Sequence, residues 1–234
     1  MKPMEAARHW RAYAQVVCIL ALFNVVISLD PSPAIAEAAK PLRIVAFGDS
    51  LSSGYGLRPG QSFPSQLQKA LKAKGHDVVV ANAGVAGDTT AAGLARLDWA
   101  VPDGTDAVIL ELGANDALRG IDPKVTRANL EKLIAAFKAR NIPVLLAGMR
   151  APPNWGDDYT QAFDTIFPEL AEAHGLVFYP FFLDGVALDA GLNQDDGMHP
   201  TGKGIAEIVK RILPSVEELI TRASANGADS ASKS

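Results

Sequence analysis

The chain has 234 residues, of which 48% are hydrophobic and 21% charged, so it is long enough for one globular domain with a substantial core. Its formal net charge of -4 provides no basic surface, which argues against a nucleic-acid partner. The one cysteine, Cys18, lies near the N-terminus, so we expect neither a disulfide nor thiol chemistry in the folded domain.

The first 36 residues are predicted to be a signal peptide. Lys2, Arg8 and Arg11 make its start positive, an apolar run follows at Val16–Leu29, and Ala34–Ala36 offers small residues for cleavage. Cleavage after residue 36 predicts a periplasmic or secreted protein. An uncleaved membrane anchor is the alternative, because the apolar run approaches the ~18–20 residues of a membrane span.

Five short apolar runs predict the strands of a sheet. They are nearly continuous in Val, Ile and Leu, which is typical of strands covered on both faces. Helical periodicity separates them, so we expect an α/β fold: a single three-layer domain with a five-stranded parallel sheet flanked by helices. The runs are Leu42–Phe47, Val78–Ala81, Ala107–Leu112, Val144–Ala147 and Leu176–Tyr179.

Between these runs, apolar residues recur three and four positions apart, as on the buried face of a helix. The last helix is predicted from about Pro200 to Arg222, with the proline in its first turn. Residues 37–222 would then form the domain. Residues 223–234 are small and polar, and are expected to be a flexible tail.

Each polar cluster of chemical interest follows a predicted strand. Ser50 follows the first strand, and the segments 82–90, 113–116 and 150–159 follow the next three. The segment 194–200 lies beyond the fifth strand, just before the last helix. Because ligands collect at the carboxyl ends of parallel strands, we expect one site at this edge of the sheet.

Ser50, in the turn Gly48-Asp49-Ser50, is the candidate nucleophile. A serine hydroxyl becomes useful when an imidazole takes its proton and an acid holds that imidazole in place. The alternative is a turn that only caps a helix. The turn is not a Gly-x-Ser-x-Gly elbow, since Ser52 stands where the second glycine would be, and the phosphate-binding Gly-Lys-Ser/Thr pattern is missing.

His199 is the candidate base, by elimination among the histidines of the domain. His76 and His174 stand where helices are expected to end, and a cation is favourable there, so a structural role is predicted for both. His199 instead lies in a polar turn just after Asp195 and Asp196. A metal-binding or capping turn is the alternative, but one His and two Asp are few ligands for a metal site, so no metal is expected.

Gly87 and Asn115 are candidates for an oxyanion hole. Attack on an ester or thioester carbonyl creates a negative oxygen that needs preorganised hydrogen-bond donors. The backbone N–H of a glycine and the side-chain amide of an asparagine can supply them. Each residue alone is weak evidence, because both stand in dipeptides that are common in turns.

Four segments together resemble the SGNH, or GDSL, hydrolase family, and most closely its periplasmic acyl-CoA thioesterases, lysophospholipases and arylesterases. The resemblance extends from Leu42 to about Pro214 and departs from the family pattern at Ala114, where glycine is common, and at Ser53, where alanine is frequent. The segments are GDSLSSGYG (48–56), NAGVAGDTT (82–90), ELGANDALRG (111–120) and QDDGMHP (194–200).

The resemblance implies a flavodoxin-like SGNH-hydrolase fold and a role for each matching residue. Ser50 would be the nucleophile, His199 the general base and Asp196 its orienting partner, preferred over Asp195 because the family pattern is Asp-x-x-His. The N–H groups of Ser50 and Gly87 and the side chain of Asn115 would form the oxyanion hole.

The implied reaction is a two-step acyl transfer that needs no cofactor and acts on a small acyl ester or thioester, such as an acyl-CoA, a lysophospholipid or an aryl ester. Leu118, Trp155 and Tyr159, in the loops 117–122 and 150–159, are expected to line a groove for the acyl chain; alternatively these loops only cover the sheet. We expect a monomer or weak dimer, without stable membrane insertion after the leader is removed.

Two other functions fit parts of this pattern. A carbohydrate O-acetyl esterase would use the same residues, but the chain lacks the added sugar-binding domain or aromatic surface that such enzymes often carry. A non-catalytic lipid-binding protein on the same scaffold would be expected to have lost the serine, asparagine or histidine, and all three are present.

Overall fold

A computed structural model describes residues 40–231 of the chain, with side chains described through residue 227. The predicted signal peptide lies outside these residues. No helix in the described part is long and apolar enough to cross a membrane.

The elements in chain order are β1 (Leu42–Gly48), α2 (Ser50–Ser53), α3 (Phe63–Ala73), β2 (Val78–Gly84), α4 (Thr90–Ala95), α5 (Leu97–Ala100), β3 (Ala107–Glu111), α6 (Ala114–Leu118), α7 (Pro123–Ala139), β4 (Val144–Ala147), the 3-10 turn η1 (Pro153–Trp155), α8 (Asp157–Asp164), α9 (Ile166–His174), β5 (Val177–Tyr179) and α10 (Gly202–Ala231).

The five strands form one parallel sheet in the order β2-β1-β3-β4-β5. Ile44 in the middle of β1 aligns with Val80 on one side and Ala107 on the other. The chain first moves outward from β1 to β2 and then crosses back to β3, so the direction of winding reverses next to β1. This is the flavodoxin-like order, in which ligands bind at the carboxyl ends of the strands near the reversal.

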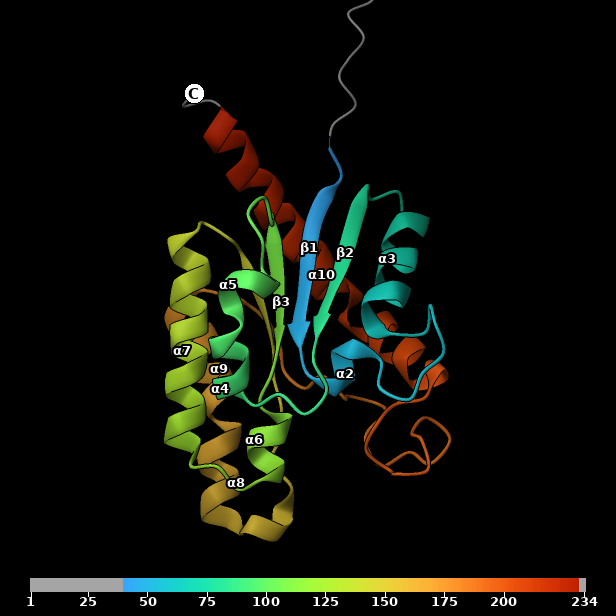
Figure 1. Cartoon of the computed structure of the whole chain (residues 1–234), viewed down its shortest axis with the longest axis vertical. Helices are drawn as coiled ribbons and strands as arrows, with labels where there is room; N and C mark the ends of the chain where they lie inside the picture. The colour runs from blue at the N-terminus through green and yellow to red at the C-terminus, as the bar shows by residue number, and fades with distance from the viewer. Residues whose placement is uncertain (1–39, 232–234) are drawn as a thin grey trace, which may run out of the picture. The chain divides into compact units, whose positions relative to one another are not determined.

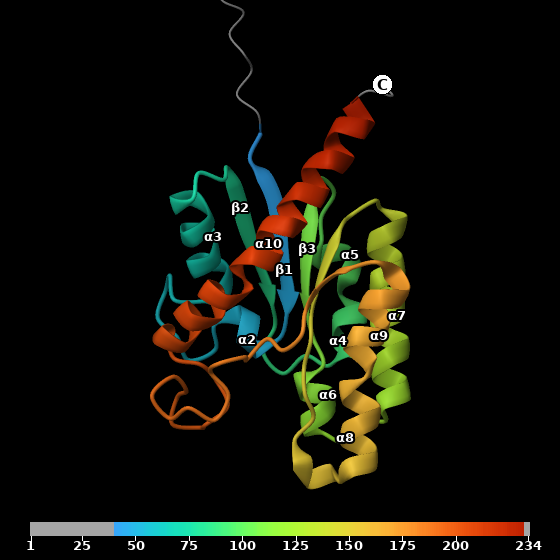
Figure 2. The same ribbon diagram turned by 180° about the vertical axis from the view of Figure 1, so that it is seen from behind.

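Helices cover both faces of this sheet. On one face α10 runs diagonally across the strands and packs against α3 and against β3 to β5 (Figure 2). On the other face α7 packs against α4 and α9, and α9 packs against β4 and β5 (Figure 1). The predicted three-layer α/β fold is therefore confirmed.

The central strands are buried along nearly their whole length. All residues of β3 and β4 are buried, as their continuous apolar sequences predicted. The strand β2 differs, because it lies at the edge of the sheet: Val78 and Val80 are buried, whereas Val79 is 41% exposed. For this one strand, burial on both faces was a wrong expectation, since an edge strand is packed mainly on one side.

The last helix differs from its predicted bounds at both ends. It begins at Gly202, just after Pro200, and it continues to Ala231, so residues 223–231 are helical rather than a flexible tail. Ala223 is buried, and the Asn226 amide donates to the backbone oxygen of Asn141 at 3.3 Å. These contacts explain why a small, polar sequence stays helical here.

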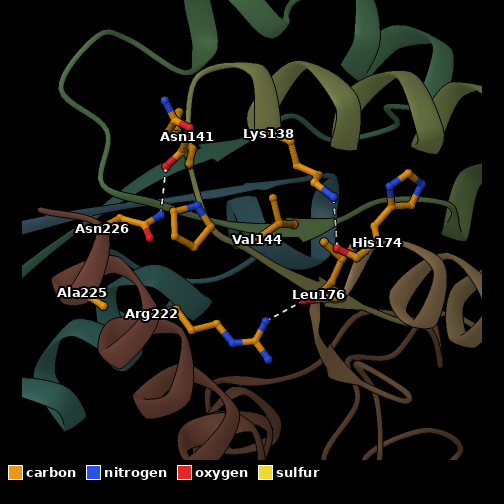
Figure 3. Close-up of a pocket in the computed structure, with 11 residues that line it drawn as sticks. Lys138, Asn141, Val144, His174, Leu176, Arg222, Ala225 and Asn226 are labelled. Atoms are coloured by element: carbon orange, nitrogen blue, oxygen red, sulfur yellow. Dashed lines mark hydrogen bonds between the residues drawn. The ribbon is translucent and has the colours of Figure 1, made fainter. Parts of the chain in front are cut away.

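The extended end of α10 forms one wall of a pocket of about 410 Å³ at the amino ends of β4 and β5 (Figure 3). Arg222 donates to the oxygen of Gly175 at 2.6 Å, and Lys138 from α7 donates to the oxygen of His174 at 3.2 Å. Both cations thus satisfy carbonyls at the end of α9, where the helix dipole favours positive charge. This pocket lies at the amino ends of the strands, whereas the polar clusters lie at the carboxyl ends.

Candidate active site

Ser50 lies in a tight turn at the carboxyl end of the central strand β1. The side chain of Asp49 caps α2 by accepting a hydrogen bond from the Leu51 N–H at 3.0 Å. The turn leaves no room for a side chain at Gly48, where a Cβ atom would lie 2.4 Å from a carboxylate oxygen of Glu111. Capping is therefore performed by Asp49, and the hydroxyl of Ser50 is free for another partner.

The structure brings Ser50, His199 and Asp196 together. The Ser50 Oγ lies 2.9 Å from His199 Nε2, although 149 residues separate them. On the other side of the ring, His199 Nδ1 lies 2.7 Å from Asp196 Oδ2. The three groups form a continuous line of hydrogen bonds, which is the arrangement that activates a serine hydroxyl.

The surroundings of Asp196 determine which way the imidazole points. The Asp196 carboxylate accepts hydrogen bonds from the backbone N–H groups of His199 and Met198, each at 2.9 Å, and these bonds with the His199 ring lower the pKa of Asp196 to about 2. An ionised carboxylate can only accept, so Nδ1 of His199 must carry a proton. The lone pair of Nε2 is then available to the Ser50 hydroxyl.

A hydrogen bond and a ring contact connect the loop that carries His199 to the segment that follows Ser50. The Gln194 amide donates to the backbone oxygen of Tyr55 at 2.9 Å and to that of Pro200 at 3.0 Å. Tyr55 also packs its ring against the His199 ring, with centroids 4.7 Å apart. These contacts hold the histidine beside the turn at Ser50.

The residues expected to form the oxyanion hole are Ser50, Gly87 and Asn115, of which Ser50 and Asn115 line one pocket together with His199. Within the described residues, the N–H groups of Ser50 and Gly87 make no hydrogen bond to the protein. Gly87 lies between β2 and α4 with φ of 84°, a conformation that favours glycine. Asn115 lies in α6, directly beyond β3, and lines the same pocket as Ser50 and His199.

Two acidic residues that sequence reasoning missed are buried beneath Ser50. Burial raises the pKa of Asp49 to about 6, although hydrogen bonds from Leu51 and Asn115 act in the other direction. Burial and the nearby charge of Asp49 raise the pKa of Glu111 well above its ordinary value. Glu111 Oε2 accepts from the Ser52 hydroxyl at 2.7 Å, while its Oε1 has no partner in the described part of the chain.

Arg96 is a third residue that the sequence did not indicate. Its Nε donates to Asp88 at 2.5 Å, its second terminal nitrogen donates to the oxygen of Gly48 at 2.9 Å, and its guanidinium lies over the Phe47 ring. Asp88 follows Gly87 directly, so this buried cation ties the Gly87 loop to the turn that presents Ser50. A signal was present in the sequence, since a lone arginine follows a run of small residues.

A pocket of about 400 Å³ opens beside Ser50, and its lining is mainly apolar. Leu118 is one of the lining residues. Much of the remaining apolar lining follows β4 and β5 and was not anticipated, although a hydrophobic run directly after a strand is visible in the sequence. It includes Met149, Phe181, Leu183, Leu188 and Met198.

Trp155 and Tyr159 do not line this pocket, which corrects the expectation for both. The Trp155 ring packs so closely on Gly120 that a Cβ atom there would lie 2.8 Å from it. The Tyr159 hydroxyl donates to the backbone oxygen of Ile121 at 2.9 Å. Both side chains therefore contact the 117–122 loop, Trp155 from the turn η1 and Tyr159 from α8.

The other two histidines of the domain lie away from this site. His76 lies 3.1 Å from a carboxylate oxygen of Glu217 in α10, and His174 ends α9. Among the residues that the structure describes, no group of three or more His, Cys, Asp or Glu side chains is arranged to hold a metal ion.

Comparisons with known proteins agree with this geometry. Residues 46–206 match the GDSL-like Lipase/Acylhydrolase family. The chain is 43% identical over 175 residues to an arylesterase of Vibrio mimicus, covering 73% of this chain and 88% of that protein. It is 39% identical over 166 residues to the thioesterase 1/protease 1/lysophospholipase L1 of Escherichia coli (strain K12), covering 70% of this chain and 77% of that protein.

A solved structure shows the same fold. The SGNH-hydrolase family esterase AlinE4 superimposes with a TM-score of 0.65 and 46% sequence identity, covering 76% of this chain and 96% of that chain. Since both the family match and the relatives span most of the domain, the chain belongs to the GDSL-like lipase/acylhydrolase (SGNH hydrolase) family and is a carboxylic ester hydrolase.

Proposed function

We propose that this chain is an exported serine hydrolase that cleaves carboxylic esters or thioesters through an acyl-enzyme on Ser50, with His199 as general base and Asp196 as its orienting partner. The observation that carries the proposal is the relay of contacts at 2.9 Å from Ser50 to His199 and at 2.7 Å from His199 to Asp196. The N-terminal signal-like sequence supports export to the periplasm or beyond the cell.

The reaction proceeds in two steps. Ser50 Oγ attacks the carbonyl carbon while its proton moves to His199 Nε2, and the carbonyl oxygen takes the negative charge among the donors of Ser50, Gly87 and Asn115. The C–O or C–S bond then breaks, and the alcohol or thiol leaves with the proton from Nε2. Water attacks the acyl-serine in the same manner and releases the carboxylic acid.

The substrates that fit best have an apolar acyl group. The pocket beside Ser50 is large enough for such a group and offers mainly carbon atoms as its lining. The names of the relatives point to aryl esters, acyl thioesters and lysophospholipids. A carbohydrate O-acetyl ester is the alternative substrate, and a panel of these esters tested with the full chain distinguishes the two.

Replacing the nucleophile tests the proposal. Ser50→Ala should lower kcat for a short-chain p-nitrophenyl ester by about 10⁴-fold or more, because the covalent intermediate cannot form. The measurement is the initial rate at saturating ester for the purified full chain, with circular dichroism to show that the fold is intact.

Ser53→Ala is the matched control, since its hydroxyl donates to the backbone oxygen of Ser50 at 3.2 Å and does not contact His199. This variant should keep kcat within about 2-fold. A Ser50→Ala protein that is folded and retains turnover would rule out Ser50 as the nucleophile.

A further inference from the structure

The buried carboxyl group of Asp49 contacts the side chain of Asn115 directly. Asn115 Nδ2 donates to Asp49 Oδ2 at 3.1 Å, while Asp49 Oδ1 accepts from the Leu51 N–H at 3.0 Å. The Asp49 side chain is completely buried, so these two donors do not compete with solvent. One carboxylate thus joins the start of α2 to the side chain of α6 that would bind the oxyanion.

This contact determines which end of the Asn115 amide faces the substrate. A primary amide has a carbonyl oxygen at one end and two N–H donors at the other. A carboxylate can only accept hydrogen bonds, so Asp49 holds the NH₂ end of the Asn115 amide. The second N–H of that NH₂ group then remains for a developing oxyanion. We infer that Asp49 is a positioning residue for the oxyanion hole, one that keeps the Asn115 amide from turning its oxygen toward the reacting carbonyl.

The charges around Asp49 agree with this role. Asp49 has a pKa of about 6, so it is mainly a carboxylate, and only an acceptor, at neutral pH. The groups that face it are His199, which lowers its pKa, Asp88, which raises it, and the buried carboxyl of Glu111. Because the pKa of Glu111 is raised well above its ordinary value, the pair holds one negative charge rather than two.

The inference rests on the proposed function and is tested by Asp49→Asn. Leu51 and Asn115 now donate to different oxygens of the carboxylate, and in the new side chain an NH₂ group replaces one of these oxygens, so one of the two donors loses its acceptor. The backbone N–H of Leu51 is fixed in a helix, so the Asn115 amide is the partner that turns. We expect kcat for a p-nitrophenyl ester to fall about 10²-fold to 10³-fold, as when one oxyanion donor is removed, with KM within about 3-fold of the original value.

A double-mutant cycle separates positioning from a general structural effect. Asn115→Ala should also lower kcat by about 10²-fold to 10³-fold. If Asp49 acts through Asn115, the double variant should be no slower than Asn115→Ala alone, because nothing is left to position. The inference would be overturned if the fall in kcat of the double variant were the product of the falls in the two single variants. An Asp49→Asn protein with unchanged kcat would also overturn it.

Asp49→Ser is the second variant, and it preserves the helix cap. A serine oxygen can accept from the Leu51 N–H but is too short to reach Asn115 as well. We expect the same fall in kcat and the same result in the cycle, with little change in melting temperature. If neither Asp49 variant folds, Asp49 is required for the fold itself and the inference is overturned.

The same set of variants distinguishes two kinds of failure. An Asn115→Ala protein with unchanged kcat would contradict the oxyanion hole of the proposed function, and this inference with it. An Asn115→Ala protein with lowered kcat, together with an independent effect of Asp49, would contradict only the positioning role.

Discussion

Glu111 ends a strand whose other residues are all apolar, and its carboxyl group is completely buried. It lies beneath the turn at Ser50, where Oε2 accepts from the Ser52 hydroxyl and, at 3.3 Å, from the Asp49 N–H. Because burial raises its pKa, the neutral form is favoured in the folded protein. The residue therefore joins strand and turn without placing a second full charge beside Asp49.

The raised pKa of Glu111 predicts how stability depends on pH. A group whose pKa is higher in the folded state stabilises the fold below its unfolded pKa, and this contribution is lost as the pH rises through the folded value. The Glu111→Gln protein lacks this titration. We expect its free energy of unfolding to fall less between pH 5 and pH 8 than that of the original chain.

Urea unfolding of both proteins at the two pH values measures this difference. Glu172→Gln, an exposed change on α9, is the control and should behave like the original chain. An equal loss of stability in the Glu111→Gln protein would contradict a neutral, buried carboxyl group.

Among the secondary-structure elements, α10 departs most from what its sequence predicts. It contains Pro214 in its interior, and yet the helix continues to Ala231. Proline lacks an N–H and its ring crowds the carbonyl four residues earlier, so it weakens a helix interior. The helix persists because its apolar face, which includes Ile212, Val216 and Leu219, is buried against the sheet.

Removing this proline should therefore stabilise the protein. Pro214 is exposed, so Pro214→Ala loses little packing and restores the missing N–H donor. We expect a gain of about 1–3 kcal/mol in the free energy of unfolding. Pro123→Ala is the matched control, because Pro123 stands in the first turn of α7, where proline is well tolerated. A Pro214→Ala protein no more stable than the original would show that the surrounding helix has already adapted to the ring.

The sequence predicted what depends on local pattern and missed what depends on packing. Continuous apolar runs predicted the strands, and short motifs predicted that Ser50, Asn115, Asp196 and His199 would meet at one edge. Arg96, by contrast, acts through partners that come together only when β1, the Gly87 loop and α4 are packed. Trp155 was misplaced because composition shows that a loop is aromatic but not which way its side chains point.

The two ends of the parallel strands have different roles in this domain. The hydroxyl, imidazole and amide groups gather at the carboxyl ends of the strands, next to the pocket that includes Met149 just after β4. At the amino ends, α10 closes the fold through Arg222 and Asn226, as in Figure 3. Substitutions at the amino ends of the strands can therefore change the stability of the fold without changing the groups at the carboxyl ends.

A shortened chain tests this separation. Ending the protein after Arg222 removes the buried Ala223 and the bond from Asn226 to Asn141. We expect the free energy of unfolding to fall by about 1–2 kcal/mol while kcat for a p-nitrophenyl ester stays within about 2-fold, as measured by urea unfolding and initial rates. A chain ending after Asn226 should lose less stability. Unchanged stability in the shorter protein would show that residues 223–231 contribute nothing to the fold.

The distance of 149 residues between the two ends of the Ser50–His199 contact has a consequence for synthesis. A ribosome that has joined the first 190 residues has produced the proposed nucleophile, Ser50, and the whole sheet, but not the proposed base, His199. Under the proposed mechanism such a nascent chain would not hydrolyse esters, however well its early part has folded. Under the same mechanism, ester hydrolysis would begin only after the segment that contains His199 has been added.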